Sequence, residues 1–262
     1  MTNANANGVP AGRNWFDQGG QDYARFRPEY PPALAAFLAG VAPGRGLAVD
    51  VGCGNGQLTH LLAPHFDRVI GLDPSADQIA NAVPHAGIEY RRAAAEHLPV
   101  ADASAHLVTA AQAAHWFDLP AFYREVRRIA LPGAVVALVS YGVLTLEPAL
   151  DARFQRFYRD EIGPYWPPER GLVDTGYATL DFPFAELPYP PMVIRVDWNL
   201  AAFLGYVQTW SAVRSVREAG RADLLAAFAD DLARAWGAPD ATRSVTWPIN
   251  MRIGRVREVR GQ

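Results

Sequence analysis

Three glycines and one acidic residue form the part of the sequence best suited to bind a ligand. Gly52, Gly54 and Gly56 alternate along a turn between the apolar segment 47–51 and a helical segment. Because glycine tolerates positive φ and has no side chain, such a turn brings the backbone against a nucleotide-like ligand. Asp50 would repel a pyrophosphate there and attract an ammonium group. The G-x-G-x-G spacing also differs from the G-x-G-x-x-G of dinucleotide sites.

A second carboxylate follows the next apolar segment, residues 68–72. Asp73 is expected at the tip of that strand, where it can accept hydrogen bonds from both hydroxyls of a ribose. Nicotinamide sites use the same device, so Asp73 indicates a ribose without identifying the ligand.

The segments 50–56 and 71–75, Asp-Val-Gly-Cys-Gly-Asn-Gly and Gly-Leu-Asp-Pro-Ser, resemble the first two motifs of class I S-adenosylmethionine-dependent methyltransferases. The resemblance implies S-adenosyl-L-methionine as cofactor, with its methionine end at the glycine turn and its ribose at the second motif. Asp50 is then expected near the ammonium group, directly or through water. The cofactor-binding residues implied in these motifs are Asp50, Gly52, Gly54, Asn55, Gly56, Asp73 and Pro74.

Two further segments resemble parts of the same family. The Tyr…Arg-Pro-x-Tyr-Pro pattern at 23–31 is similar to the N-terminal segment of the trans-aconitate methyltransferase-like branch, which folds over the cofactor, and this implies that Tyr23 and Arg27 contact it. The alternative is a core-covering aromatic and a solvated charge. Residues 94–99 resemble the segment that flanks the adenine ring, which implies Ala95 and Glu96 as contacts. Otherwise Glu96 is a solvated loop acid.

A fourth strand is expected over 106–112, and the residues at its end and just after it are candidates for the reaction centre. Ligands of open parallel sheets lie beyond the carboxyl ends of the strands, which places Gln112, His115 and Trp116 near the methyl donor. The Gln-x-x-His-Trp-Phe run also resembles the fourth motif of that branch. His115 is a candidate base for a hydroxyl or amine acceptor, or a packed histidine that orients the loop. The expected substrate-binding residues are His115, Trp116, Tyr141 and Trp210.

The elements that must position these residues alternate as strands and helices. Five such strands predict an α/β, Rossmann-like, doubly wound, mostly parallel sheet, and the resemblance adds an antiparallel final strand. We expect a flexible tail over 1–13, a cofactor-binding core over 14–145 and 240–262, and a helical, aromatic and proline-rich substrate cap over 146–239. Within these regions, 119–130 is expected as a helix with a solvated arginine face, and 200–216 as one helix.

Composition limits the chemistry. The 262 residues carry a net charge of −3 and no lysine, which excludes Schiff-base and lysine-nucleophile mechanisms. A single cysteine, Cys53, excludes an internal disulfide, and the histidines show no metal-site spacing. No basic run and no membrane-length apolar segment occur, so we expect a cytoplasmic monomer or weak homodimer that binds neither nucleic acid nor membrane.

Together these features predict a methyltransferase that acts on a small-molecule acceptor. In the trans-aconitate-like branch the acceptor is a carboxylic acid converted to its methyl ester, and Arg27 or Arg195 would then pair with the carboxylate. The alternatives are O- or N-methylation of an aromatic biosynthetic intermediate and a non-catalytic cofactor-binding module. A nicotinamide oxidoreductase is opposed by Asp50, by the glycine spacing and by the lack of any Tyr-x-x-x-Lys pair.

Overall fold

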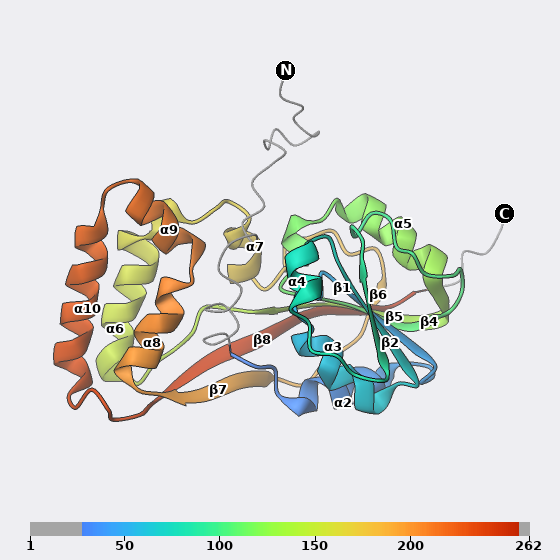
Figure 1. The fold of residues 1–262 in the computed structure, drawn as a ribbon, viewed down its shortest axis with the longest axis horizontal. Helices are drawn as coiled ribbons and strands as arrows, with labels where there is room; N and C mark the ends of the chain where they lie inside the picture. Colours follow the sequence, from blue (N-terminus) through green and yellow to red (C-terminus); the bar gives the residue numbers. More distant parts are fainter. Residues whose placement is uncertain (1–27, 257–262) are drawn as a thin grey trace, which may run out of the picture.

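The computed structural model describes residues 28–256, and a mixed sheet forms its centre (Figure 1). Within this range the sheet has eight strands in the order β3-β2-β1-β4-β5-β8-β6, and β7 also pairs with β8. Among the described strands, β1 to β5 pair in parallel, and each antiparallel pair is one of β8 with β5, β6 or β7. The strands are β1 Leu47–Val51, β2 Arg68–Asp73, β3 Ile88–Arg92, β4 Ala105–Ala111, β5 Ala130–Tyr141, β6 Ala185–Glu186, β7 Met192–Trp198 and β8 Arg243–Arg255. The predicted fold class is confirmed.

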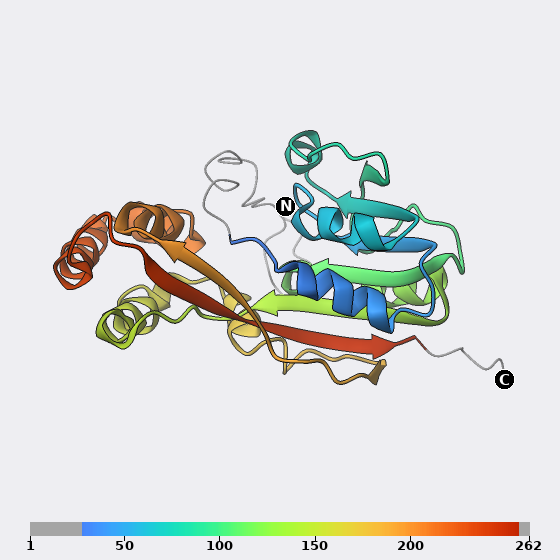
Figure 2. The ribbon, with the colours of Figure 1, turned by 90° about the horizontal axis from the view of Figure 1, so that it is seen from below.

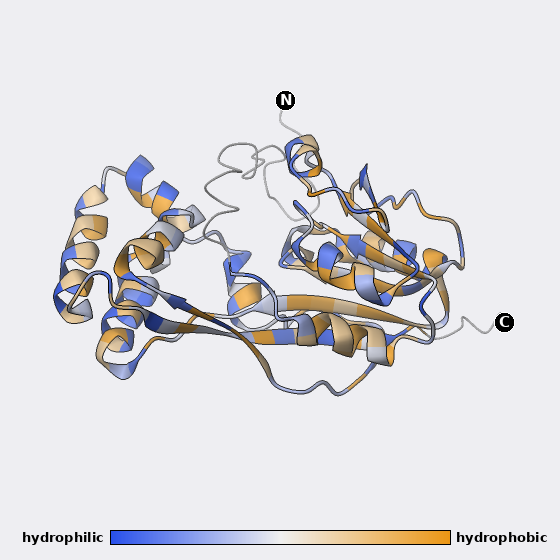
Figure 3. Cartoon of the chain, turned by 60° about the horizontal axis from the view of Figure 1, so that its bottom comes forward, coloured by the Kyte–Doolittle hydropathy of each residue, from blue (hydrophilic) through white to orange (hydrophobic). Residues whose placement is uncertain are grey.

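Side chains along the parallel strands alternate between two apolar layers, because successive strand residues point to opposite faces. Ala48 of β1 packs in the layer of α2 and α3, whereas Val49 packs in the layer of α5 and α7. The strands at the centre of the sheet are largely apolar in Figure 3, while the helices around them show polar and apolar faces. The α-helices are α2 Pro32–Val41, α3 Gln57–Leu62, α4 Ala76–Ala80, α5 Leu119–Ile129, α6 Pro148–Arg156, α7 Arg170–Asp174, α8 Leu200–Gln208, α9 Ser211–Glu218 and α10 Ala222–Trp236.

A separate helical layer lies at the end of the molecule away from the parallel strands, and it consists of α6, α8, α9 and α10 (Figure 1). The long strand β8 connects the two ends, pairing with β5 through Ile249–Arg255 and with β7 through Arg243–Ile249 (Figure 2). Aromatic side chains fill the helical end: the rings of Phe157 and Phe228 stack with centroids 3.8 Å apart. These helices lie where the substrate cap is expected.

Three details differ from the sequence expectations. Strands β6 and β7 belong to the sheet although they lie within 146–239, so the segment expected as cap also extends the sheet. The helix expected over 200–216 is two helices, because the backbone of Trp210 is extended (φ −76°, ψ 143°) and starts α9. Strand β5 begins at Ala130, so the helix expected over 119–130 ends one residue earlier, at Ile129. The predicted domain boundaries themselves stay predictions.

In the part of the chain described here, every helix is too short or too polar to cross a membrane. Residues 1–27, which include the expected tail and the candidate residues Tyr23 and Arg27, lie outside the described residues.

Candidate functional site

The three glycines of the turn after β1 all have positive φ, at 68°, 56° and 97°. At Gly52 a Cβ atom would collide with the side chain of Ala113, and at Gly56 with the hydroxyl of Tyr90. At Gly54 a Cβ would meet just one atom of the described residues within 4 Å, at 3.6 Å. Gly52 and Gly56 therefore permit packing inside the protein, and Gly54 is the position where a ligand can approach the backbone.

The N–H groups of this turn are used within the protein. Gly52 and Cys53 donate to the carbonyl of Leu72 at 2.7 and 3.0 Å, and Gly54 donates to Oδ2 of Asp73 at 2.9 Å. An anion such as a pyrophosphate would need these donors. The expectation that turn N–H groups face the ligand is therefore wrong for these three amides. The remaining lone pairs of the turn carbonyls and of the Asp73 carboxylate can accept from a ligand, which favours a bound cation.

Asp73 lies at the end of β2, as expected, and its side chain is 9% exposed. Its Oδ1 accepts a hydrogen bond from the N–H of Ser75 at 2.8 Å, while Oδ2 is held by Gly54. Burial raises the pKa of this carboxyl group, although the two backbone hydrogen bonds oppose that effect. Each oxygen keeps a lone pair with which it can accept a ribose hydroxyl. Pro74 is exposed, and its carbonyl accepts from Nε of Arg92 at 2.9 Å.

Asp50 has a structural role that its position in the motif did not reveal. It is 1% exposed, and its two oxygens accept hydrogen bonds from the hydroxyls of Thr59 and Thr109, each at 2.7 Å. Burial raises the pKa of Asp50 from 3.8 to about 6, and the threonine bonds lower it less than burial raises it. Asp50 thus joins β1 to α3 and β4. Its contact with an ammonium group stays a prediction, and a direct one would need a lone pair beyond those that the threonines use.

The segment expected beside an adenine ring is fixed to the start of α5. Ala95 is buried, and Glu96 is exposed with its Oε1 accepting from the N–H of Asp118 at 2.9 Å. Asp118 in turn caps α5 through the N–H of Ala121 at 3.1 Å. Glu96 is therefore more than a solvated loop acid, because it joins this segment to the loop that carries His115. Whether Ala95 and Glu96 contact a ligand stays a prediction.

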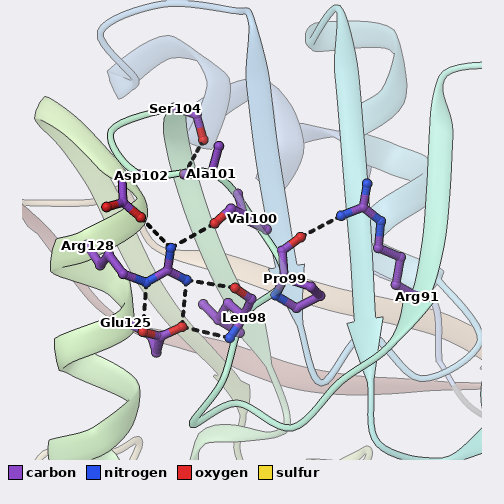
Figure 4. Close-up of polar contacts among 9 residues, drawn as sticks. All are labelled: Arg91, Leu98, Pro99, Val100, Ala101, Asp102, Ser104, Glu125 and Arg128. Atoms are coloured by element: carbon purple, nitrogen blue, oxygen red, sulfur yellow. Dashed lines mark hydrogen bonds and ion pairs between the residues drawn. The ribbon is translucent and has the colours of Figure 1, made fainter.

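Arg128 holds the same segment from α5 (Figure 4). All five of its N–H groups donate, at 2.6 to 2.8 Å, to the carbonyls of Leu98 and Val100 and to the carboxylates of Asp102 and Glu125. Glu125 also accepts from the N–H of Leu98 at 2.7 Å, and its bonds to Arg128 lower its pKa to about 2. The expected solvated arginine face is therefore wrong for Arg128. Sequence reasoning could not separate it from the exposed Arg124, because three of its partners, Leu98, Val100 and Asp102, follow a different strand.

The carboxyl ends of β4 and β5 bring the expected reaction-centre residues together. Gln112 has positive φ (53°), and its Nε2 donates to the carbonyl of Tyr141 at 3.1 Å. Nδ1 of His115 lies 2.9 Å from the hydroxyl of Tyr177, and the ring of His115 lies 4.8 Å from that of Trp116. Sequence reasoning missed Tyr177, which is 62 residues away from its partner. Without the fold, nothing distinguishes Tyr177 from the other aromatics of its segment.

Trp210 lies within the aromatic cluster of the helical end and is 7% exposed. Its ring is 5.4 Å from those of Trp166 and Tyr206 and 5.7 Å from that of Tyr158. In contrast, Trp116 is 41% exposed beside His115. Trp116 is thus open to an acceptor, whereas a role for Trp210 and for the buried Tyr141 in acceptor binding stays a prediction.

These features fit S-adenosylmethionine. The open backbone at Gly54 and the oxygen acceptors of the turn suit a cationic methionine end, and Asp73 suits a ribose. Cys53 does not compete as a nucleophile, because burial raises the pKa of its thiol. Among the described residues, no group of three or more His, Cys, Asp or Glu side chains is arranged to hold a metal ion.

Comparison with known proteins agrees with this assignment. A family model described as a methyltransferase domain matches residues 49–138. A methyltransferase-family protein of Dictyostelium discoideum is 33% identical over 242 residues, covering 90% of this chain and 92% of that protein. A malonyl-[acyl-carrier protein] O-methyltransferase of Hahella chejuensis is 40% identical over 91 residues, or 32% of this chain and 33% of that protein.

The solved structures include one from Anaeromyxobacter dehalogenans that is assigned as a type II methyltransferase. It is 48% identical, has a TM-score of 0.84, and covers 88% of this chain and 99% of its own. The alternatives of a nicotinamide oxidoreductase and of a non-catalytic binding module therefore lose their support. The chain belongs to the class I S-adenosylmethionine-dependent methyltransferases and is an enzyme of that family.

Proposed function

We propose that the enzyme methylates the carboxylate of a small organic acid, giving a methyl ester. The observation that carries this proposal is the position of Arg170, on helix α7, which packs against the turn of His115. Its Nε donates to the hydroxyl of Tyr158 at 2.8 Å and to Oδ1 of Asp174 at 2.9 Å. Within residues 28–256 its terminal Nη groups donate no hydrogen bond. The guanidinium carbon also lies 5.0 and 5.7 Å from the ring centroids of Trp166 and Tyr158, so packing and the Nε bonds hold the group in place. A guanidinium held in this way can present its Nη donors to a carboxylate.

The reaction asks little of the protein beyond alignment. Bound S-adenosylmethionine supplies a methyl group on a sulfonium, which is already activated for displacement. A carboxylate oxygen forms the new O–C bond as the C–S bond breaks, and the electron pair of that bond goes to sulfur. Because no proton moves, no general base is required. The residues of this chain need to hold the acid in line and to exclude water, and the exposed ring of Trp116 suits the second task.

The alternative acceptor, an aromatic hydroxyl or amine, has weaker support. The aromatic side chains of the helical end that favour it, Tyr158, Tyr206 and Trp210, are each less than 8% exposed. They therefore form the interior of that layer rather than an open stacking surface. Arg195, one of the arginines expected to bind a carboxylate, is exposed on β7, and Arg27 lies outside the described residues.

Two wider considerations support the proposal. The relative from Hahella chejuensis is named as an O-methyltransferase, so oxygen methylation fits the wider family. The net charge of −3 and the lack of a basic run suit a small-molecule acceptor and not a nucleic acid. The trans-aconitate-like branch, the cytoplasmic location and the monomeric or weakly dimeric state stay predictions.

The test uses purified enzyme and donor labelled in the methyl group, with panels of small carboxylic acids, phenols and amines. Methyl esters release volatile methanol in mild base, whereas aryl ethers and methylamines do not. We expect base-labile label with at least one acid, and Arg170→Gln should raise KM for that acid about tenfold or more. Arg195→Gln is the matched control and should leave KM unchanged. Base-stable label on phenols or amines, with none on acids, would overturn the proposal.

A further inference from the structure

The buried hydroxyl of Tyr177 is the hydrogen-bond partner of one ring nitrogen of His115. Tyr177 is 0% exposed, follows α7 with φ 62°, and places its hydroxyl 2.9 Å from Nδ1 of His115. Either group can donate in such a pair, because a neutral imidazole has one N–H and one bare nitrogen. The choice follows from where each proton can go.

The position of Tyr177 is fixed by its backbone as well as by its hydroxyl. Its N–H donates to the carbonyl of Leu172 at 2.8 Å. Nη1 of Arg252 donates to the carbonyls of Tyr177 and Leu180 at 3.2 and 3.0 Å, and Nη2 donates to Glu186 at 2.6 Å. Arg252 thus clamps this segment to β8, so the ring of Tyr177 has a defined position beside His115.

The proton of the Tyr177 hydroxyl has one acceptor among the described residues, and that acceptor is Nδ1 of His115. Burial raises the pKa of Tyr177 far above its ordinary value, so the hydroxyl stays protonated. The backbone of His115 lowers the pKa of Tyr177, but by less than burial raises it. If Nδ1 donated instead, the hydroxyl proton would be buried without a partner, which costs about 1–3 kcal/mol.

We propose that Tyr177 donates to Nδ1 of His115, so that His115 carries its proton on Nε2 and serves the acceptor as a hydrogen-bond donor, not as a general base. In this arrangement neither nitrogen of the neutral ring offers a lone pair to a substrate proton. A phenol or amine that must lose a proton gains nothing from it, whereas an anionic carboxylate gains a charge-assisted hydrogen bond. Tyr177 is then a positioning residue that sets the tautomer. This assignment of substrate class rests on the proposed function, but the tautomer itself does not.

The tautomer is measured in the ligand-free enzyme by long-range proton–nitrogen correlation NMR on protein labelled with ¹⁵N-histidine. His115→Gln identifies the signals of His115 by their loss. We expect a bare, pyridine-type nitrogen at Nδ1 and a protonated, pyrrole-type nitrogen at Nε2. Tyr177→Phe should convert this pattern to an average of both tautomers. The control Tyr123→Phe removes another buried hydroxyl, bound to the carbonyl of Asp181, and should leave the pattern unchanged. A protonated Nδ1 in the wild type would overturn the inference.

Measurements of enzyme activity distinguish a hydrogen-bond donor from a general base at His115. The side-chain amide of glutamine can supply an N–H in place of Nε2–H but cannot take up a proton. His115→Gln should therefore keep kcat/KM for the acid within about tenfold of wild type, whereas His115→Ala should lose about 10- to 100-fold. A loss in His115→Gln of about a thousandfold would be that of a missing base and would overturn the donor role. If only phenols or amines were methylated, the proposed function would fail, while the nitrogen spectrum would still decide the tautomer.

Discussion

Replacing Asp50 by asparagine should change how the stability of this enzyme depends on pH. Asp50 is buried, and its oxygens accept hydrogen bonds from Thr59 and Thr109. Asparagine has the same shape: its Oδ1 can accept from one threonine and its Nδ2 can donate to the hydroxyl oxygen of the other. The substitution therefore removes the charge while keeping both contacts.

The magnitude follows from the pKa of Asp50, which burial raises from 3.8 to about 6 in the folded state. Because the folded state binds the proton more tightly than the unfolded chain, stability falls as the pH rises between these two values. The difference of about two pH units, at about 1.4 kcal/mol per unit, gives about 3 kcal/mol. The Asp50 carboxyl group is thus most favourable to stability below about pH 4, where it is protonated in both states. Its full destabilising effect of about 3 kcal/mol is present above about pH 6.

The assay is urea unfolding of wild type and Asp50→Asn at several pH values from 4 to 7.5. Since other groups titrate in both proteins, the relevant quantity is the difference in unfolding free energy between them. We expect that difference to move by about 3 kcal/mol in favour of Asp50→Asn as the pH rises. Asp67→Asn, which removes an exposed carboxylate, is the control. A difference that varies by less than about 1 kcal/mol over this range would refute the reasoning.

Two further substitutions test the parts that shape the site. Gly52→Ala should destabilise the protein by about 2–4 kcal/mol in urea unfolding and abolish binding of S-adenosylhomocysteine, because its Cβ would overlap Ala113 at φ 68°. The control is Gly133→Ala, where φ is also positive (75°) but no described atom lies within 4 Å of the added Cβ. It should lower the free energy of unfolding by only about 1 kcal/mol. Equal losses of stability in the two variants would contradict the packing argument. Arg128→Ala should cost about 2 kcal/mol, a value reduced for its 32% exposed side chain, and should speed hydrogen exchange at residues 98–104. Arg124→Ala, on the exposed side of α5, should change the free energy of unfolding by no more than about 0.5 kcal/mol. A loss as large as that of Arg128→Ala would contradict a stabilising role for the Arg128 contacts.

The fold was predictable from local patterns, because all parallel strands except the polar β3 contain an apolar run and each is separated from the next by a helix or a turn. The glycine turn was predictable for the same reason, since Gly52, Gly54 and Gly56 and the strand before them are contiguous. The limit appears at Trp210: its neighbours favour one continuous helix, but packing against other aromatic rings accompanies an extended residue there.

Most polar contacts of the site were not predictable, because they join residues that are distant along the chain. Asp50 meets Thr109 at a separation of 59 residues, and His115 meets Tyr177 at 62. Residue type indicated that Asp50 attracts cations, but only the structure shows that its oxygens are already engaged. Arg128 illustrates the same limit, since a charged residue on a helix gives no sign of whether a loop or solvent lies beside it.

The central claim is that the glycine turn and Asp73 hold S-adenosylmethionine, and calorimetric titration with S-adenosylhomocysteine and with NADH tests it most directly. Wild-type enzyme should bind the first and not the second. Asp73→Asn keeps the shape but replaces one oxygen, which accepts from a backbone N–H as well as from the ribose, by a donor, and it should weaken binding by about 10- to 100-fold. Asp77→Asn, on the exposed side of α4, should bind like wild type. Binding of NADH, or equal affinity in Asp73→Asn and wild type, would contradict the account.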